Sequence, residues 1–402
     1  RPSPIQVFRT KGLTRYGNSR FQKSFVVLQF VVTIALGTGL LFVFKQLNYM
    51  KNHDLGFEKE NLLILSARAT GQNKEQQLKN TDLFIDKLES YQAQYGYSKA
   101  SVTEFVPGFG YWNNFKIYPQ GILHDVGTEL KSAAVDENFV DVFKRKMVMG
   151  RFFSSQIASD DNALIINKAA LKKFGWDDIE NKYIGFHDKN NKVPVIGVIN
   201  DIHINSLQHP IEPMIYRFGA KNNYPGFITF RLHAERQAET IKFVKSQWEE
   251  LFPEVPFESR FIADQFNAAY GEEEKLMRII GIFAGMALFL SLLGIVALSV
   301  LFSERKIKEI GIRKVNGAKV KEILVMLNSN FIRWITIAFA FACPVTWIVI
   351  SKWLENFAYK TPMHWWIFIL SGALSMIIAL ITVSWQSFRA ASRNPVEALR
   401  YE

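Results

Sequence analysis

Four long segments of the chain carry no formal charge: residues 25–44, 279–302, 334–351 and 361–388. A helix rises 1.5 Å per residue, so about 20 apolar residues cross the hydrocarbon core of a bilayer. Inside that core every backbone amide must bond within the chain, as it does in a helix. Pro344 interrupts the third segment, but a membrane helix tolerates proline when neighbouring groups satisfy the freed carbonyl. The sequence therefore predicts an integral membrane protein with four transmembrane helices.

The basic side chains indicate how these helices are oriented. Residues 1–24 carry a net charge of +6, residues 303–331 carry +4 and the tail from Gln386 carries +1, which together make the whole net charge of +11. Short basic segments beside membrane helices stay in the cytoplasm. Both termini and the 303–331 segment are therefore predicted inside, and residues 48–272 outside. Topology explains the positive charge, so we expect no nucleic-acid partner.

The predicted organisation follows from these two patterns. It consists of a basic cytoplasmic segment (1–24), helix 1 (25–47), an outer domain (48–272), helix 2 (273–302), a cytoplasmic helix and loop (303–331), helix 3 (332–351), an outer loop (352–360), helix 4 (361–388) and a cytoplasmic tail (389–402).

The outer segment is long enough to bury its own core, at about 225 residues. It contains no cysteine, because the single cysteine of the chain is Cys343 in the third apolar segment. Short β-like runs ("NLLIL", "ALIIN", "VPVIGVI", "FITFRL") alternate with helical stretches ("EQQLKNTDLFIDKLESYQ", "AERQAETIKFVKSQWEELF"). This mixture predicts a large α+β domain inserted between helices 1 and 2.

The segment "SERKIKEIGIRKVNGAKVKEIL" (303–324) follows the second apolar run directly and holds seven basic and three acidic residues. Its apolar positions recur near the 3.6-residue period of a helix, so a short helix at the inner membrane surface is predicted. A simple positively charged anchor would explain the basic residues. It would not explain the interleaved acidic residues, nor Gly311 and Gly317.

Catalytic motifs are missing from the sequence. There is no phosphate loop, no G-x-S-x-G, no H-E-x-x-H and no cysteine pair for zinc. In "DIHINSLQHP", Asp201, His203 and His209 lie close together, but their spacing is no standard metal signature, and polar residues of a structural loop are the better interpretation. We therefore expect no metal site, no cofactor and no enzymatic activity on this chain, and an envelope enzyme is disfavoured.

Two further patterns bear on assembly. Gly281 and Gly285 form a G-x-x-x-G in the second apolar segment, a spacing that lets helices pack closely but also occurs by chance. "PIQVFR" (4–9) echoes "PVEALR" (395–400), which suggests that the chain is the second half of a tandem duplication, with a chance match as the alternative.

Several stretches resemble one family. "ERKIKEIGIRKVNGAKVKEIL" resembles the cytoplasmic coupling motif of the MacB/FtsX-type ABC transporter permeases, and "NPVEALRYE" resembles their C-terminal ending. "VDENFVDVFKRKMVMGRFFS", "ALIINKAALKKFGW" and "VIGVINDIHINSLQHPIEPMIY" resemble their periplasmic core domain. The start "PIQVFRTKG" resembles the junction between the halves of duplicated permeases in Bacteroidetes-type bacteria. The chain departs from the family pattern at Asn316, where leucine is common, and at Ile202, where many relatives have phenylalanine.

The resemblance implies a permease half in the bacterial inner membrane, with a periplasmic domain and stalk extensions of helices 1 and 2. It implies that a separate cytoplasmic ABC ATPase, which carries the ATP, docks on the coupling helix through Glu309, Ile310, Gly311, Arg313, Lys314, Gly317 and Ala318. The other implied partners are a second permease half (in the same polypeptide or a dimer), a periplasmic adaptor or envelope partner, and membrane lipids. Such permeases act mechanically in export, efflux, or lipoprotein and peptide handling.

A regulatory role is the alternative. FtsX-type relatives transmit motion driven by an ATPase to a cell-envelope partner without moving a substrate. The same resemblance therefore also fits a membrane-anchored regulator or sensor.

The orientation can be tested by chemical labelling. In a Cys343→Ala background, single cysteines in place of Ser19 or Ser303 should resist an impermeant thiol reagent in intact cells, because both lie in basic segments predicted inside. A cysteine in place of Ser159, in the outer domain, should react. Labelling at Ser303 from outside would overturn the orientation.

Overall fold

The computed structural model describes residues 19–67, 74–95, 99–108, 113–122, 127–219, 226–306, 309–310, 312–313 and 316–391. The repeat expected between residues 4–9 and 395–400 lies outside the described residues. The chain divides into two compact units. A membrane unit comprises residues 1–49, 272–356 and 360–402, and an outer unit comprises residues 50–271 with residues 357–359.

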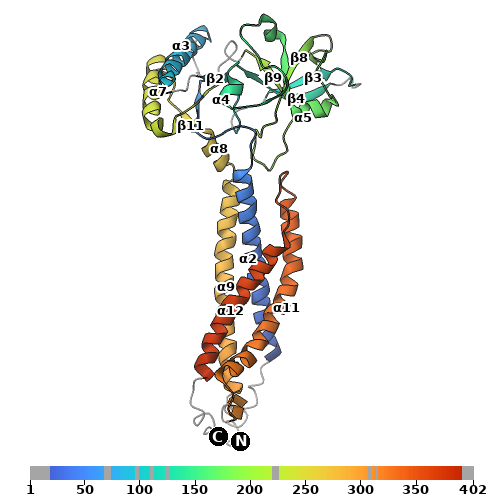
Figure 1. Cartoon of the computed structure of the whole chain (residues 1–402), viewed down its shortest axis with the longest axis vertical. Coiled ribbons are helices and arrows are strands. Elements are labelled where there is room, and N and C mark those ends of the chain that lie inside the picture. Colours follow the sequence, from blue (N-terminus) through green and yellow to red (C-terminus); the bar gives the residue numbers. More distant parts are fainter. Residues whose placement is uncertain are drawn as a thin grey trace, which may run out of the picture. The chain divides into compact units, whose positions relative to one another are not determined.

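Four described helices are long and apolar enough to cross a membrane. They are α2 (Ser19–Asn52), α9 (Gly271–Arg305), α11 (Val320–Leu354) and α12 (Trp365–Ala391), drawn as the long helices of Figure 1. Both α9 and α11 run beyond their charge-free segments, and α11 continues as one helix through Pro344. With the large α+β domain between α2 and α9, the predicted fold class is confirmed.

A shared hydrophobic cluster joins all four helices. It combines Phe30 of α2, Ile295 of α9, Phe331 of α11 and Val383 of α12, each almost fully buried. Since lipid is as apolar as these side chains, close packing and polar contacts must add to the stability of the bundle. The Thr33 and Ser291 hydroxyls lie 2.9 Å apart and form one such contact between α2 and α9.

The helix α9 is the least covered of the four. Only 11% of its most apolar 18-residue stretch is buried, against 44% of the corresponding stretch of α2. Its exposed large hydrophobic side chains are Ile279, Ile282, Phe283, Met286, Phe289, Leu290, Leu293 and Leu301. This face of α9 is therefore free to contact lipid or another helix.

The outer unit begins with one β-α-β unit and ends with another, and the strands of the two alternate in the sheet. In the first, α3 (Lys74–Ala93) connects β1 (Leu62–Ser66) to β2 (Ala100–Thr103). In the second, α7 (Gln237–Leu251) connects β10 (Phe227–Arg231) to β11 (Ser259–Phe261), after the short turn η2 (Ala234–Arg236). The strand order is β11-β1-β10-β2, and all three neighbouring pairs are antiparallel. The two strands of each β-α-β unit therefore lie on either side of one strand from the other β-α-β unit. Figure 1 shows α3 and α7 side by side.

A closed ring of strands is inserted between β2 and β10. It runs β4-β3-β7-β8-β6-β9 and closes because β9 pairs in parallel with β4. Closure leaves no free edges within the ring. The strands are β3 (Asn113–Pro119), β4 (Thr128–Val135), β6 (Leu164–Asn167), β7 (Tyr183–Phe186), β8 (Lys192–Ile199) and β9 (Met214–Phe218), with β5 (Met147–Gly150) paired to β8.

Short helices accompany the ring. They are α4 (Phe139–Val142), η1 (Ala158–Asn162) and α5 (Lys168–Phe174), while α8 (Ile262–Ala268) precedes α9. The start of α5 is fixed by Asn167, whose side-chain oxygen accepts hydrogen bonds from the N–H groups of Ala170 and Met214, both at 2.9 Å. Gly175 ends the helix in the left-handed conformation, with φ of 68°. One capped helix is thereby tied to β9.

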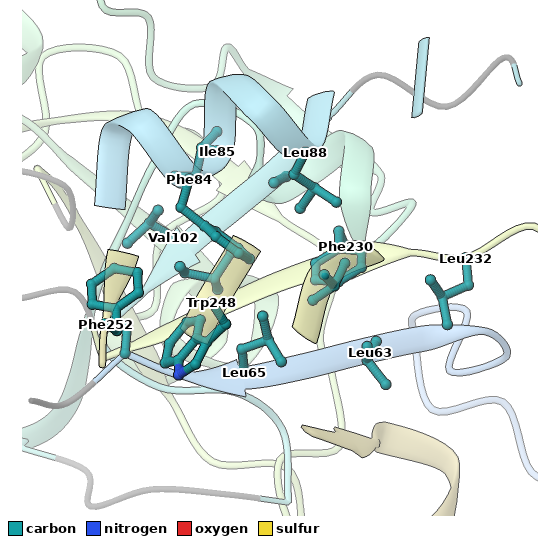
Figure 2. Packing of buried hydrophobic residues seen from close by; sticks show 14 of the residues in the cluster. Leu63, Leu65, Phe84, Ile85, Leu88, Val102, Phe230, Leu232, Trp248 and Phe252 are labelled. Carbon is teal, nitrogen blue, oxygen red and sulfur yellow. The ribbon is translucent and has the colours of Figure 1, made fainter. Parts of the chain in front are cut away.

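The outer unit has two cores, one for each half. In the first, Trp248 packs edge-on against Phe84 of α3, with ring centroids 5.4 Å apart, and its ring is tilted by 33° against that of Phe252, with centroids 4.5 Å apart. Figure 2 shows these rings gathered over Leu65 of β1. The second core fills the ring and includes Ile166, Ile184 and Ile215. The strands and helices expected from the short apolar runs are confirmed as β1, β6, β8, β10, α3 and α7.

These cores predict that the outer domain folds alone. Residues 52–268 should express as a soluble, folded monomer without an oxidant, because the domain depends on buried apolar area and not on disulfides. Trp248→Ala should lower its free energy of unfolding by about 3–5 kcal/mol, whereas Lys245→Ala on the exposed face of α7 should change it by about 0.5 kcal/mol or less. Urea unfolding and near-ultraviolet circular dichroism measure both. A molten product would show that the core extends beyond these residues.

Candidate functional site

Between α9 and α11, the described residues 309–310 and 312–313 are helical, in the segment where the sequence predicted a short helix. The Ile310 N–H donates to the Lys306 carbonyl at 2.8 Å, and the Asn316 N–H donates to the Ile312 carbonyl at 3.0 Å. Both bonds span four residues, as in an α-helix. Gly311 and Lys314, two of the predicted docking residues, lie outside the described residues.

One buried side chain holds this helix against α11. Ile310 is buried in a small cluster with Ile323 and Leu327 of α11. Its neighbour Ile312 is 55% exposed, although it is of similar size and equally apolar. The helix therefore has one side anchored to its own chain, and it leaves one apolar side chain exposed and available to contact lipid or a partner.

The charged residues form a compact pattern on the same turn. Glu309 accepts from Arg313 at 2.8 Å and also lies 3.3 Å from the Lys306 ammonium. These side chains are between about a third and a half exposed, so each pair contributes roughly 0.2–1 kcal/mol. The pairs add little stability, but they hold Arg313 in one orientation at the surface.

Gly317 ends the helix. Its φ is +87°, in the left-handed region, and the Ala318 N–H donates to the Arg313 carbonyl at 2.9 Å. A glycine followed by this six-residue bond is the Schellman ending of a helix. A Cβ at Gly317 would meet no described atom within 4 Å. The backbone angle is thus a reason for glycine within the chain itself, separate from the docking of an ATPase that the resemblance implies at this residue. Ala318, the last predicted docking residue, supplies the closing N–H.

The two glycines predicted to pack helices have different surroundings. A Cβ at Gly281 would lie 3.7 Å from Leu40 of α2, whereas one at Gly285 would meet no described atom within 4 Å. The tightest approaches among glycines of the membrane helices are elsewhere: a Cβ at Gly294 would lie 2.5 Å from the Gln29 side chain of α2, and one at Gly372 would lie 2.5 Å from the Phe339 ring of α11. Neither lies in a G-x-x-x-G, so spacing alone could not have found them. Packing through Gly285 remains a prediction that needs a partner helix.

The "DIHINSLQHP" loop, with Asp201, His203 and His209, was considered above as a possible metal site. Among the described residues, no group of three or more His, Cys, Asp or Glu side chains could hold a metal ion. Within that loop, His203 packs edge-on against Tyr359, with ring centroids 4.7 Å apart.

The two explanations for Gly317 can be separated experimentally. Gly317→Leu should destabilise the helix end by about 1–2 kcal/mol, since a side chain is strained at positive φ, and should speed amide exchange at residues 312–318 roughly tenfold. Gly317→Asn should change exchange less, because asparagine tolerates this conformation. If Gly317→Asn still prevents a partner from binding, close approach matters too. Exchange in Gly317→Leu at the wild-type rate would refute the capping role.

Part of the chain is similar to a known family of permeases. Residues 281–395 match the FtsX-like permease C-terminal family. The macrolide export ATP-binding/permease protein MacB of Bdellovibrio bacteriovorus is 27% identical over 286 residues, which cover 63% of this chain and 41% of that protein. The chain thus spans about two fifths of the length of this curated relative.

Solved structures are similar to part of the chain. The periplasmic region of MacB from Actinobacillus actinomycetemcomitans is 14% identical, with a TM-score of 0.37, and the match covers 55% of this chain and 97% of that one. The extracellular domain of the noncanonic ABC-type transporter YknZ from Gram-positive bacteria is 16% identical, with a TM-score of 0.34, covering 50% and 98%. Residues 281–395 are thus similar to an FtsX-like permease domain, and the chain, with four described helices of membrane length and an α+β domain between the first two, is similar to permeases of the MacB/FtsX type.

Proposed function

We propose that this chain is an ABC transporter permease subunit that binds a separate cytoplasmic ATPase through residues 309–318 and transmits its conformational change to the outer domain. The observation that carries the proposal is the short cytoplasmic helix. It is anchored by Ile310, ended by Gly317, and presents Ile312 and Arg313 to solvent. A rigid helix with an exposed apolar and basic surface suits docking to another protein better than simple anchoring.

ATP hydrolysis belongs to the partner in this proposal. The name of the MacB relative combines ATP binding with a permease, and the present chain spans 41% of that protein. Its own sequence holds no phosphate loop. The chain's part is then mechanical, in export, efflux, or lipoprotein and peptide handling. A regulator or sensor that passes the same motion to an envelope partner without transport is the alternative.

The remaining partners follow from the membrane unit. The exposed apolar face of α9, which includes Phe289 and Gly285, supports contact with a second permease half and with lipid. A location in the bacterial inner membrane with a periplasmic outer domain agrees with the predicted orientation. A periplasmic adaptor or another envelope partner would bind the outer domain.

Charge exchange within the helix tests docking. Arg313→Glu should abolish co-purification of the ATPase, but it also places two carboxylates together with Glu309. The double variant Glu309→Arg/Arg313→Glu restores the pair inside the helix while moving the positive charge by one turn. If the ATPase recognises the position of the charge, the double variant should also lose it, by tenfold or more.

The matched control is Lys245→Glu/Glu249→Lys, which exchanges an exposed pair of the same spacing in α7. It should leave ATPase binding, membrane insertion and folding unchanged. Two quantities are measured in nanodiscs: the amount of ATPase retained on the tagged full-length chain, and the rate of ATP turnover. Wild-type retention and turnover in both coupling-helix variants would refute docking at this helix.

A further inference from the structure

The loop between β8 and β9, residues 201–209 with sequence "DIHINSLQH", is bonded to three separate segments of the outer unit. The His203 N–H donates to the Leu55 carbonyl at 3.0 Å, and the Ile204 carbonyl accepts from the Gly108 N–H at 2.8 Å. The third segment is residues 357–359. Its Ala358 and Tyr359 N–H groups donate to the carbonyls of residues 208 and 207, at 3.0 and 3.3 Å.

Aromatic contacts reinforce two of these connections. The Tyr359 ring lies 4.7 Å from the His203 ring and 5.7 Å from the His53 ring, and the two imidazoles are 5.6 Å apart. Burial, and to a lesser extent nearby His53, lower the pKa of His203 to about 4, against a smaller opposite effect of Asp54. His203 is therefore neutral at physiological pH and packs as an apolar ring.

The loop is rigid at its base. Arg145 is buried and its guanidinium donates to the Asn200 carbonyl, while the Asn200 N–H donates to the Lys146 carbonyl at 3.0 Å. The Asp201 carboxylate accepts from the Ala169 N–H at 2.8 Å. Ile202, Ile204 and Leu207 are also buried. A loop with this much burial and bonding moves with the ring of strands rather than independently of it.

The three bonded segments share one property in the sequence. His53 and Leu55 directly follow α2. Gly108 accepts from the Gln265 side chain of α8 at 3.2 Å, and α8 leads into α9. Residues 357–359 lie between α11 and α12 yet group with the outer unit. Each place where the chain passes between the two units is thus adjacent in sequence to a segment bound, directly or through Gly108, to residues 201–209.

We propose that the 201–209 loop is a junction that gathers the connections from all four membrane helices, and that the His203–Tyr359 contact positions the outer domain to follow the last helix pair. This rests on the proposed function, since it assigns a route to the motion that the ATPase supplies. His203 and Tyr359 are positioning residues. Polar residues of a merely structural loop would support folding but would not affect the response to ATP.

The contact itself can be tested without an ATPase. In the full-length Cys343→Ala chain in membranes, Gln208→Cys and Ala358→Cys should form a disulfide with mild oxidant, because their backbones are hydrogen-bonded neighbours. The cross-linked pair should add no maleimide-polyethylene glycol until it is reduced. The control pair Lys245→Cys/Ala358→Cys, with one cysteine on α7, should add two under the same conditions. Two additions to the 208/358 pair after oxidation would overturn the junction.

Transmission is tested with the ATPase bound in nanodiscs. Hydrogen exchange of the outer domain should change between the nucleotide-free and ATP–vanadate states in the wild type and in Tyr359→Phe, which keeps the ring. Tyr359→Ala should retain ATPase binding but lose at least three quarters of that change. In the same way, His203→Phe should keep the change in hydrogen exchange, because it keeps a ring, and His203→Ala should lose most of it. Oxidising the 208/358 cysteine pair in Tyr359→Ala should restore the change, and reduction should remove it.

The outcomes separate the two proposals. If Tyr359→Ala responds like the wild type, or if oxidation and reduction make no difference to it, the junction is overturned while ATPase docking stands. If the wild-type chain neither binds an ATPase nor responds to nucleotide, the proposed function fails and transmission through the junction fails with it. The cross-link would then still report the contact between the two segments.

Discussion

The hydrogen-bonding needs of the backbone in a bilayer constrain this chain more than any other interaction. An unbonded amide in hydrocarbon costs several kcal/mol, so each of the four long apolar segments must be helical. Charged and irregular segments are then excluded from the bilayer. They form the helical residues around Glu309 between α9 and α11, and the large outer unit between α2 and α9.

Much of the architecture could be predicted because its signals are local. A charge-free run of membrane length identifies a helix by itself, and runs such as "ALIIN" and "FITFRL" identify β6 and β10. The closed ring could not be predicted, because it depends on β4 pairing with β9 across about 80 residues of sequence, and no local pattern specifies which strands meet. The inclusion of residues 357–359 in the outer unit was hidden for the same reason.

The sequence identified residues of the candidate site, but it did not indicate the backbone conformations and packing contacts that explain them. The family resemblance indicated Gly317 as a docking residue, whereas its φ of +87° shows that it also ends a helix within the chain. Spacing indicated Gly281 and Gly285, whereas the closest helix approaches are at Gly294 and Gly372, where the neighbour is a large side chain on another helix. The His203 region read as a polar loop because its partners, Leu55 and Tyr359, are far away in the sequence.

The central claim is that motion passes from the cytoplasmic helix to the outer domain, and a distance measurement tests it most directly. Spin labels on cysteines replacing Lys245 in α7 and Lys352 near the end of α11 would report on the two units in nanodiscs containing the ATPase. The account predicts that ATP–vanadate shifts the distance distribution in an otherwise wild-type chain and leaves it unchanged in the Glu309→Arg/Arg313→Glu background. Identical distributions with and without ATP–vanadate, in a chain that has bound its ATPase, would contradict it.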